Sequence, residues 1–567
     1  MTVATAASQA LDPTVAWDAL VIGGGATGAG LLRDLARRGM RTLLVDRSDL
    51  GTGTSGRYHG LLHSGGRYVA RDADAARECI VENRIVRRIA AFAVEDTGGY
   101  FVATPDDPDD YVEAFAANCA ASGVDCDEVD VATLLEHEPA LDRRIRRAFR
   151  VPDGSIEPWQ LIEATLADAR AHGSEAASYH RVIGFELTAG RIVAARLRNE
   201  RDGSETKVWT QFVVSAAGAW AGQIAAFAGV EVEMTPGKGT MLIYNHRMTD
   251  AVINRCHKSS DGDIMVPVHT VAILGTTDIK VPDPDDYDIT REEVARLVDE
   301  GTKLFPDLPR MRILRAYAGV RPLYKPPAET AAGGNRSISR AHAILDHADQ
   351  GVENFVSIVG GKLTTHRLMA EQTVDVVVDK MGLDAPCTTA DEALPDQPGS
   401  TYWLGHRLAD IEHEGGGDAD LLCECELVTR PMAEAYLDRH WPCTIDDLRR
   451  GTRVGMGPCQ GAFCTFRVAG LIAERLDAAD PAVSGVTAAP DGGAAGARAE
   501  HAATADRALA AFLRERFKGS RPIAHGRQLQ ELLMTNGIYT GVLGLDSLAA
   551  DGEPPPVAEE AAVDAAR

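Results

Sequence analysis

A dense run of arginine, histidine and tyrosine at 55–68, SGRYHGLLHSGGRY, is the part of the chain most suited to chemistry. Arginine carries a fixed charge that pairs with phosphate or carboxylate groups. Histidine, with an ordinary pKa of about 6.5, accepts a proton at neutral pH. Such residues usually occur singly on surfaces or in satisfied core positions, so a run this dense indicates a loop that faces a ligand. It contains Arg57, His59, His63, Arg67 and Tyr68.

A glycine-rich motif typical of dinucleotide binding precedes this loop. DALVIGGGATGAG (18–30) predicts a strand, a tight turn and a helix, with Gly23, Gly25 and Gly28 at the spacing G-x-G-x-x-G. These glycines permit the turn, the approach of backbone to a pyrophosphate, and close helix packing. A second predicted strand ends on Asp46, about where an acid hydrogen-bonds the adenosine ribose. A glycine-rich turn without a ligand is the alternative, and the motif alone does not separate FAD from NAD.

Four cysteines further along the chain form two local pairs, which indicates a metal or iron–sulfur site. Cys423 and Cys425 form C-x-C, Cys459 and Cys464 form C-x4-C, and 33 residues separate the pairs. Zinc sites more often show C-x2-C pairs. Glycine-rich turns such as GMGPCQGAFC (455–464) place N–H donors near sulfur atoms, which tunes a cluster. The pattern favours a [2Fe–2S] cluster, with zinc or no metal as the alternatives.

The composition is that of a globular, strongly acidic protein. The net charge is −25, with 9 lysines against 49 arginines. Such a surface suits a high-salt cytoplasm, where self-repulsion is screened, although an acidic enzyme from a GC-rich genome is the simpler alternative. Nucleic acid is not an expected partner. Residues 1–17 lack the basic start and apolar run of an export signal, and no apolar stretch predicts a membrane span.

The elements that must position these residues alternate between strands and helices. Glycine-rich turns follow predicted strands in VVSAAGAWAGQ (213–223) and FVSIVGGKLTTHRL (355–368), and each precedes a helical pattern. A helix that begins there aims its N–H groups at whatever lies in front of it. Strands at 264–268 and 271–278 and a helix at 291–305 lie between these turns. The alternation predicts an α/β fold, and the length predicts roughly three to four domains.

Six motifs together resemble the FAD-dependent glycerol-3-phosphate dehydrogenase family, and within it the A subunits of the anaerobic, multi-subunit branch. The resemblance covers roughly residues 18–545. The cysteine segment resembles the ferredoxin-like [2Fe–2S] domain of bacterioferritin-associated ferredoxin, which the aerobic, single-subunit members lack. The six motifs are GGGATGAG (23–30), GRYHGLLHSGGRY (56–68), GTTD (275–278), AGVRPL (318–323), GGKLTTHRL (360–368) and FLRERFKGSRPIAHG (512–526).

The resemblance implies an activity, two cofactors and several partners. The reaction is the oxidation of sn-glycerol 3-phosphate to dihydroxyacetone phosphate on FAD, with electrons leaving through the [2Fe–2S] cluster. They would pass to B and C subunits of the complex and then to quinone, so the chain is expected to be cytoplasmic and peripheral on the inner face of the membrane. An FAD-dependent amino-acid or hydroxy-acid dehydrogenase and a non-catalytic electron-transfer subunit are the alternatives, because fold does not decide function.

The resemblance also assigns roles to individual residues. Aerobic members carry a histidine, proposed as the base, where this chain has Met241, which cannot accept a proton. His63 is therefore the candidate base, with orientation of the flavin as its alternative role. The other expected roles are catalytic for Arg321 and Lys362; substrate-binding for Arg67, Tyr68 and Arg340; cofactor-binding for Gly23, Gly25, Gly28, Asp46, Ser55, Gly218, Gly361, Leu363 and Thr364; and cluster-binding for Cys423, Cys425, Cys459 and Cys464.

The expected fold is α/β with α+β insertions. It combines an FAD-binding Rossmann-like domain, a mixed-sheet substrate domain and a small helical ferredoxin-like domain. The expected boundaries are a disordered N-terminus at 1–17, an oxidoreductase with interleaved FAD and substrate subdomains at 18–410, a linker at 411–420, the ferredoxin-like [2Fe–2S] domain at 421–476, a flexible insertion at 477–505, a helical segment at 506–548 and an acidic tail at 549–567.

Overall fold

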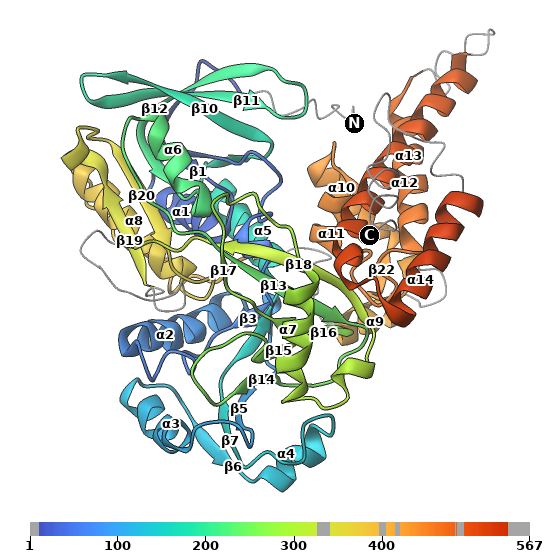
Figure 1. Cartoon of the computed structure of the whole chain (residues 1–567). Coiled ribbons are helices and arrows are strands. Elements are labelled where there is room, and N and C mark those ends of the chain that lie inside the picture. The colour runs from blue at the N-terminus through green and yellow to red at the C-terminus, as the bar shows by residue number, and fades with distance from the viewer. Residues whose placement is uncertain are drawn as a thin grey trace, which may run out of the picture. The chain divides into compact units, whose positions relative to one another are not determined.

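A computed structural model describes residues 11–325, 341–395, 404–413, 420–481, 483–484 and 493–542. The chain forms two compact units. The larger unit contains Ala7–Arg312 and Ala316–Ala409, and the smaller one contains Asp410–Arg567 with Ile313–Arg315. Two large sheets characterise the larger unit, whereas the smaller unit is mainly helical (Figure 1).

The dinucleotide motif folds as the first β-α-β unit of an eight-stranded sheet. Strand β1 (Ala16–Ile22) lies between β2 (Thr42–Val45) and β12 (Glu205–Ser215). Strand β9 (Glu175–Ala177) lies beyond β2, and β20 (Phe355–Gly360) lies beyond β12. All five are parallel, so their carboxyl ends meet at one edge, where ligands bind in sheets of this kind.

Antiparallel strands complete this sheet. The first half of β12 pairs with β11 (Arg191–Asn199), which pairs with β10 (His180–Thr188). On the other side, β19 (His342–Asp346) pairs with β20. Strand β12 therefore belongs both to an antiparallel meander and, in its second half, to the parallel core.

Helices cover both faces of the sheet because each face is apolar. On one face, α1 (Ala26–Arg37) packs against α5 (Pro158–Ala171) and α8 (His366–Met381) over a fully buried cluster that includes Leu31. On the other face, α6 (Ala221–Phe227) contributes to a second cluster. This arrangement fixes the start of α1 in front of the carboxyl ends of the strands.

A second sheet, of nine strands, forms the mixed sheet expected for a substrate domain. Only its pair β14–β5 is parallel among the registers described. Its order is β17 (Ile279–Lys280), β13 (Gly237–Tyr244), β16 (Val271–Gly275), β15 (Ile264–Val268), β14 (Val252–Arg255), β5 (Gly99–Ala103), β7 (Arg147–Val151) and β6 (Asp127–Val129), with β18 (Ile313–Arg321) on β13.

Shorter elements link the two sheets. The loop at 55–68 contains β3 (Leu61–Leu62), which pairs with β8 (Gly154–Ile156), and β8 pairs with β4 (Val94–Glu95). The helices of this region are α2 (Ala73–Ile89), α3 (Asp109–Ala121), α4 (Val131–His137) and α7 (Arg291–Thr302).

The smaller unit differs from the expected boundaries. Apolar residues of α13 (Gly493–Ser520), among them Leu509 and Phe512, complete the core around the cysteine segment, so 421–476 does not form a separate core. Its other elements are β21 (Leu421–Cys423), β22 (Val428–Thr429), α10 (Arg430–His440), α11 (Ile445–Thr452), α12 (Cys464–Ala479) and α14 (Gly526–Gly537).

Regular structure also enters three stretches that were expected to lack it. Strand β1 begins at Ala16, within 1–17, and α9 (Leu404–His413) enters the linker at 411–420. Helix α13 begins inside the stretch 477–505, because its alanines favour helix. The tail at 549–567 lies outside the described residues. In the part of the chain that is described, no helix is long and apolar enough to cross a bilayer.

Candidate functional site

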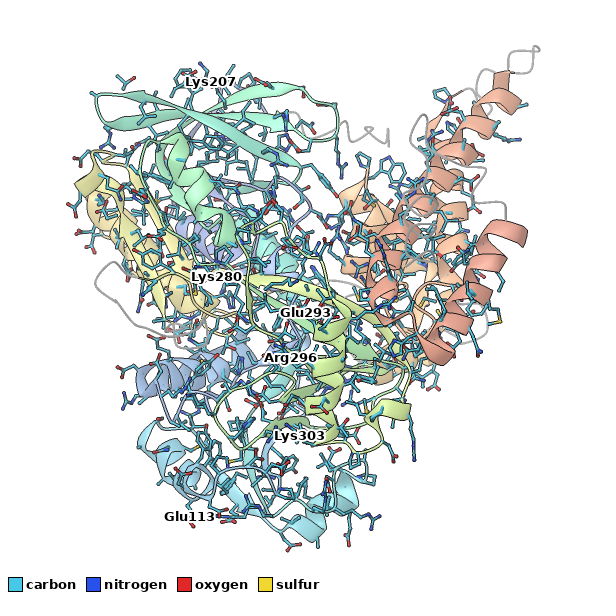
Figure 2. The ribbon with its side chains drawn as sticks, in the orientation of Figure 1. Glu113, Lys207, Lys280, Glu293, Arg296 and Lys303 are labelled. Carbon is cyan, nitrogen blue, oxygen red and sulfur yellow. The ribbon has the colours of Figure 1, made fainter. Side chains whose placement is uncertain are left out.

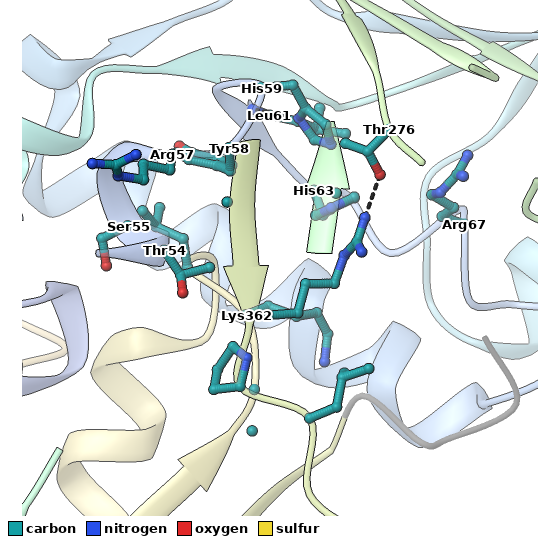
Figure 3. A pocket seen from close by; sticks show the side chains of 18 of the residues that line it. Thr54, Ser55, Arg57, Tyr58, His59, Leu61, His63, Arg67, Thr276 and Lys362 are labelled. Carbon is teal, nitrogen blue, oxygen red and sulfur yellow. Dashed lines mark hydrogen bonds between the residues drawn. The ribbon is translucent and has the colours of Figure 1, made fainter. Parts of the chain in front are cut away.

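A cleft of about 610 Å³ brings the chemistry-bearing loop and the glycine motif together (Figure 3). Residues that directly follow β1 and β20 line it, together with the 54–68 loop and residues of the second sheet. Arg340 lies outside the described residues. The predicted site residues that line the cleft are Ser55, His63, Arg67, Tyr68, Arg321, Gly361, Lys362 and Leu363.

The glycine turn has the close packing that its spacing predicts. Gly23 has a φ of +110°, and a Cβ there would lie 2.5 Å from the carbonyl oxygen of Ala216. A Cβ on Gly28 would overlap the carbonyl oxygen of Gly23. Gly25 caps α1, and the N–H groups of the first helical turn have no partner within the helix. The turn therefore offers a backbone cradle for a pyrophosphate, which fits FAD.

Two side chains close around this turn. The Gly24 N–H donates to Asp46 Oδ2 at 2.7 Å, and the Ala26 N–H donates to Ser55 Oγ at 3.0 Å. The Ser48 N–H donates to Asp46 Oδ1 at 2.9 Å. Burial raises the pKa of Asp46, while these hydrogen bonds oppose the rise. Asp46 and Ser55 thus shape the turn itself.

The turn after β20 forms the opposite wall of the cleft. Gly360 and Gly361 have φ values of +78° and +77°, a left-handed conformation that favours glycine. A Cβ on Gly361 would overlap Met369 Sδ. Thr364, which is almost fully buried, accepts a hydrogen bond from the His63 backbone N–H at 3.0 Å. This bond ties the turn to the loop at 55–68 across 301 residues of sequence.

His63, Tyr68 and Lys362 form a continuous group in the cleft. The rings of His63 and Tyr68 lie 5.6 Å apart, and the Lys362 Nζ lies 5.1 Å from the Tyr68 ring centre. Asn83 Nδ2 donates to the His63 carbonyl oxygen at 3.0 Å, which fixes the backbone of this residue. A proton-accepting ring, a cation and a phenol therefore share one wall.

The GTTD loop surrounds the guanidinium of Arg321. Arg321 Nη1 donates to Asp278 Oδ1 at 3.1 Å, and Nη2 donates to the Thr277 carbonyl at 2.9 Å and to Thr276 Oγ1 (Figure 3). A Cβ on Gly239 would lie 2.5 Å from Nη2, so the glycine leaves room for the charge. Arg321 is thus a fixed cation whose two Nη atoms are engaged by protein groups.

Glu293, at the start of α7 (Figure 2), supports this loop from behind. It forms a capping box with Thr290. Its Oε1 accepts from Thr240 Oγ1 at 2.7 Å and from Thr277 Oγ1 at 3.2 Å, and its Oε2 lies 3.2 Å from Lys238 Nζ. The carboxylate is buried, and its bonds fix the loop that holds Arg321.

Several of these residues escaped the sequence analysis. Asp278 lies inside the GTTD motif, so the motif could have indicated it, whereas no pattern marked Gly239 or Glu293. Gly218, expected at the cofactor, lies in a short 3-10 helix (Gly218–Trp220) outside the described lining of the cleft. Met241, in β13, does line the cleft. The roles of individual residues remain predictions.

Comparison with known proteins gives the family. The family described as FAD dependent oxidoreductase matches residues 18–376. The A subunit of the anaerobic glycerol-3-phosphate dehydrogenase of Escherichia coli (strain K12) is 40% identical over 556 residues, which cover 94% of this chain and 98% of the relative. The A1 subunit of the Haloferax volcanii enzyme is 39% identical over 568 residues, covering 94% and 92%. This chain belongs to the anaerobic glycerol-3-phosphate dehydrogenase A-subunit family.

Solved structures confirm the α/β flavoprotein fold expected for this family. Glycerol-3-phosphate dehydrogenase from Bacillus halodurans, complexed with FAD, is similar with a TM-score of 0.58 at 20% identity, covering 88% of this chain and 95% of that one. L-alpha-glycerophosphate oxidase from Mycoplasma pneumoniae, with FAD bound, has a TM-score of 0.54 at 16% identity, covering 68% and 100%. At these identities the likeness concerns the fold alone.

The four paired cysteines of this family member lie together in the smaller unit. The thiol of Cys459 contacts those of Cys464 and Cys425, and the thiol of Cys464 also contacts that of Cys423. The hydrogen bond from Cys464, aided by backbone N–H groups, lowers the pKa of Cys459 to about 5. Burial raises the pKa of Cys425 to about 11.

Backbone donors surround these sulfur atoms, as a cluster site requires. Gly455 and Glu426 donate to Cys423, and Gly461 and Phe463 donate to Cys459. Within the described ranges, however, no group of three or more histidine, cysteine, aspartate or glutamate residues is arranged to hold a metal ion. The chemistry of the donor set fits an iron–sulfur cluster, and the identity of the group stays a proposal.

Proposed function

We propose that this chain is the FAD-dependent catalytic subunit that oxidises sn-glycerol 3-phosphate to dihydroxyacetone phosphate. The observation that carries the proposal is the cleft, because it joins the dinucleotide turn to His63, Arg67 and Lys362. Membership of the A-subunit family supports the same reaction. An amino-acid or hydroxy-acid substrate would not require this many fixed cations beside the cofactor turn.

The residues that would hold FAD lie at two walls of the cleft. The turn of Gly23, Gly25 and Gly28 and the first N–H groups of α1 would bind the pyrophosphate. Asp46 and Ser55 shape that turn. Gly361, Leu363 and Thr364 would meet the flavin ring, where the N-terminus of α8 favours negative charge. When bound, FAD supplies the hydride acceptor of the reaction.

The remaining residues act on the substrate. Oxidation of a secondary alcohol removes a hydride from C2 and a proton from the hydroxyl group, and His63 would accept that proton. Arg67 and Lys362, with Arg340, would bind the phosphate, and Tyr68 lies beside Lys362. Arg321 would stabilise negative charge that develops on the oxygen. The fixed position of its guanidinium suits this role.

An absorption spectrum tests the function directly. The purified protein should show flavin absorbance that anaerobic addition of glycerol 3-phosphate bleaches. Glutamate, sarcosine and lactate serve as controls and should leave the spectrum unchanged, because none of them carries a phosphate for the cationic cleft. Bleaching by one of these three, or by none of the four compounds, would contradict the proposal.

We further propose that Cys423, Cys425, Cys459 and Cys464 bind a [2Fe–2S] cluster. The mutual contacts of the thiols and the N–H donors around them support this site. Electrons would leave the flavin through the cluster and pass to B and C subunits and then to quinone. The relatives are named as one lettered component of an enzyme, which supports partner subunits, and through these the chain would dock on the inner face of the membrane.

Replacing Cys459 by serine is expected to remove the iron while FAD is retained, because this thiol contacts two of the other three. Iron and zinc content by mass spectrometry, together with the visible spectrum, measures the effect. Cys443→Ser is the matched control, since this cysteine of the same unit belongs to neither pair motif. Wild-type iron content in Cys459→Ser, or zinc in place of iron in the wild type, would refute the cluster.

A further inference from the structure

Arg67 is held from behind by Asp263, a carboxylate that no motif of the sequence indicates. Asp263 directly precedes β15, and its side chain is fully buried. Both carboxylate oxygens accept from Arg67 Nη2, at 2.7 and 2.8 Å. The Ser260 N–H donates to Asp263 Oδ2 at 2.7 Å. The carboxylate therefore has a fixed position between backbone and guanidinium.

The surroundings of Asp263 keep it ionised. Burial alone would raise the pKa of Asp263, but the charge of Arg67 and contacts with His257 and Ser260 hold this pKa well below its usual range. His257 Nε2 lies 3.6 Å from Asp263 Oδ2, and its Nδ1 lies 3.9 Å from Asp107 Oδ1. A permanent negative charge thus stands behind the guanidinium.

The pairing occupies one nitrogen of Arg67. Both hydrogen bonds to Asp263 come from Nη2, and among the described residues Arg67 makes no other hydrogen bond. Its side chain is 12% exposed and lines the cleft. Nε and Nη1 are therefore available to an anion in the cleft. Arg321 differs, because both of its Nη atoms donate to the GTTD loop.

We propose that Asp263 is the positioning residue that orients Arg67 toward the phosphate of the substrate. The identity of that anion rests on the proposed function. Two effects of the carboxylate oppose each other: its charge repels a phosphate, whereas its hydrogen bonds hold the guanidinium in place before the ligand arrives. Orientation prevails in this proposal, because the pair is buried and has two short bonds.

A double-mutant cycle separates the two effects. Asp263→Asn should raise KM for glycerol 3-phosphate about 10-fold or more, since small misplacements of a binding group are costly, and change kcat far less. In an Arg67→Ala background the same change should add nothing. Asp168→Asn is the matched control, because Asp168 is a buried partner of Arg33 and Arg37, which do not line the described cleft. Its KM should equal that of the wild type.

A second measurement does not depend on turnover. The FAD-loaded, oxidised protein is titrated with inorganic phosphate and followed by flavin absorbance. Asp263→Asn should weaken phosphate binding about 10-fold, and Asp168→Asn should not. If glycerol 3-phosphate fails to bleach the wild type while this difference persists, the proposed function fails and the positioning role stands.

Three results would overturn the positioning role. Tighter phosphate binding or a lower KM in Asp263→Asn would show that the carboxylate acts only through its charge. An equal loss in the Arg67→Ala background would show a general structural defect. Asp263→Glu keeps the charge and moves the carboxylate by one methylene, so an unchanged KM in this variant would also exclude orientation, even if Asp263→Asn fails to fold.

Discussion

Replacing His63 by asparagine is expected to slow flavin reduction by about 10²- to 10⁴-fold, the usual contribution of a general base. FAD should stay bound, because the hydrogen bonds that join this residue to Thr364 and Asn83 use its backbone N–H and carbonyl groups. Asparagine keeps those groups and loses only the ring that accepts a proton. Stopped-flow absorbance after anaerobic mixing with glycerol 3-phosphate gives the rate, and the spectrum of the purified variant gives the FAD content.

His59 provides the comparison that identifies the base. It also lines the cleft, but its Nδ1 accepts the Leu61 N–H at 3.3 Å, so that nitrogen is not available for a substrate proton. His59→Asn should therefore reduce the rate less than His63→Asn. Flavin reduction at the wild-type rate in His63→Asn would remove His63 from the mechanism, and a larger loss in His59→Asn would transfer the role to His59.

Replacing Gly28 by alanine is expected to release FAD and to destabilise the larger unit. The added Cβ would overlap the Gly23 carbonyl oxygen, so α1 must move away from the turn that would hold the pyrophosphate. Overpacking of this kind costs about 1–3 kcal/mol of folding free energy. The FAD-to-protein ratio after gel filtration and the Tm measure the two effects.

Gly184→Ala is the control for this change, because a Cβ on that strand residue meets no atom within 4 Å. It should keep its FAD and the wild-type Tm. A Gly28→Ala protein that retains a full complement of FAD would show that the turn tolerates the displacement, and the helix would then not need its close approach to the strand.

Local patterns predicted the parts of the site that depend on neighbouring residues. The strand, glycine turn and helix from Ala16 to Arg37 appear where the motif placed them, because glycine spacing and apolar periodicity act within a few residues. The turn after β20 was predicted for the same reason. Fold class followed from the alternation of strands and helices.

Long-range partners could not be predicted in this way. Asp263 lies 196 residues from Arg67, and Asp278 lies 43 residues from Arg321, so no spacing rule connects them. A buried carboxylate has the same letter in the sequence as an exposed one, and only the fold shows which arginine it meets. The stretch at 477–505 misled for another reason: its alanine and glycine content suggested flexibility, whereas the core contacts of α13 stabilise a helix there.

Glu293 couples motion of the cleft wall to motion at the start of α7. The same carboxylate caps that helix and accepts hydrogen bonds from Thr240 and Thr277. The wall can open only when the helix end also opens, so amide protons of the two segments should exchange as one cooperative unit. Slow fluctuations at the substrate are thus governed by a helix of which no described residue lines the cleft.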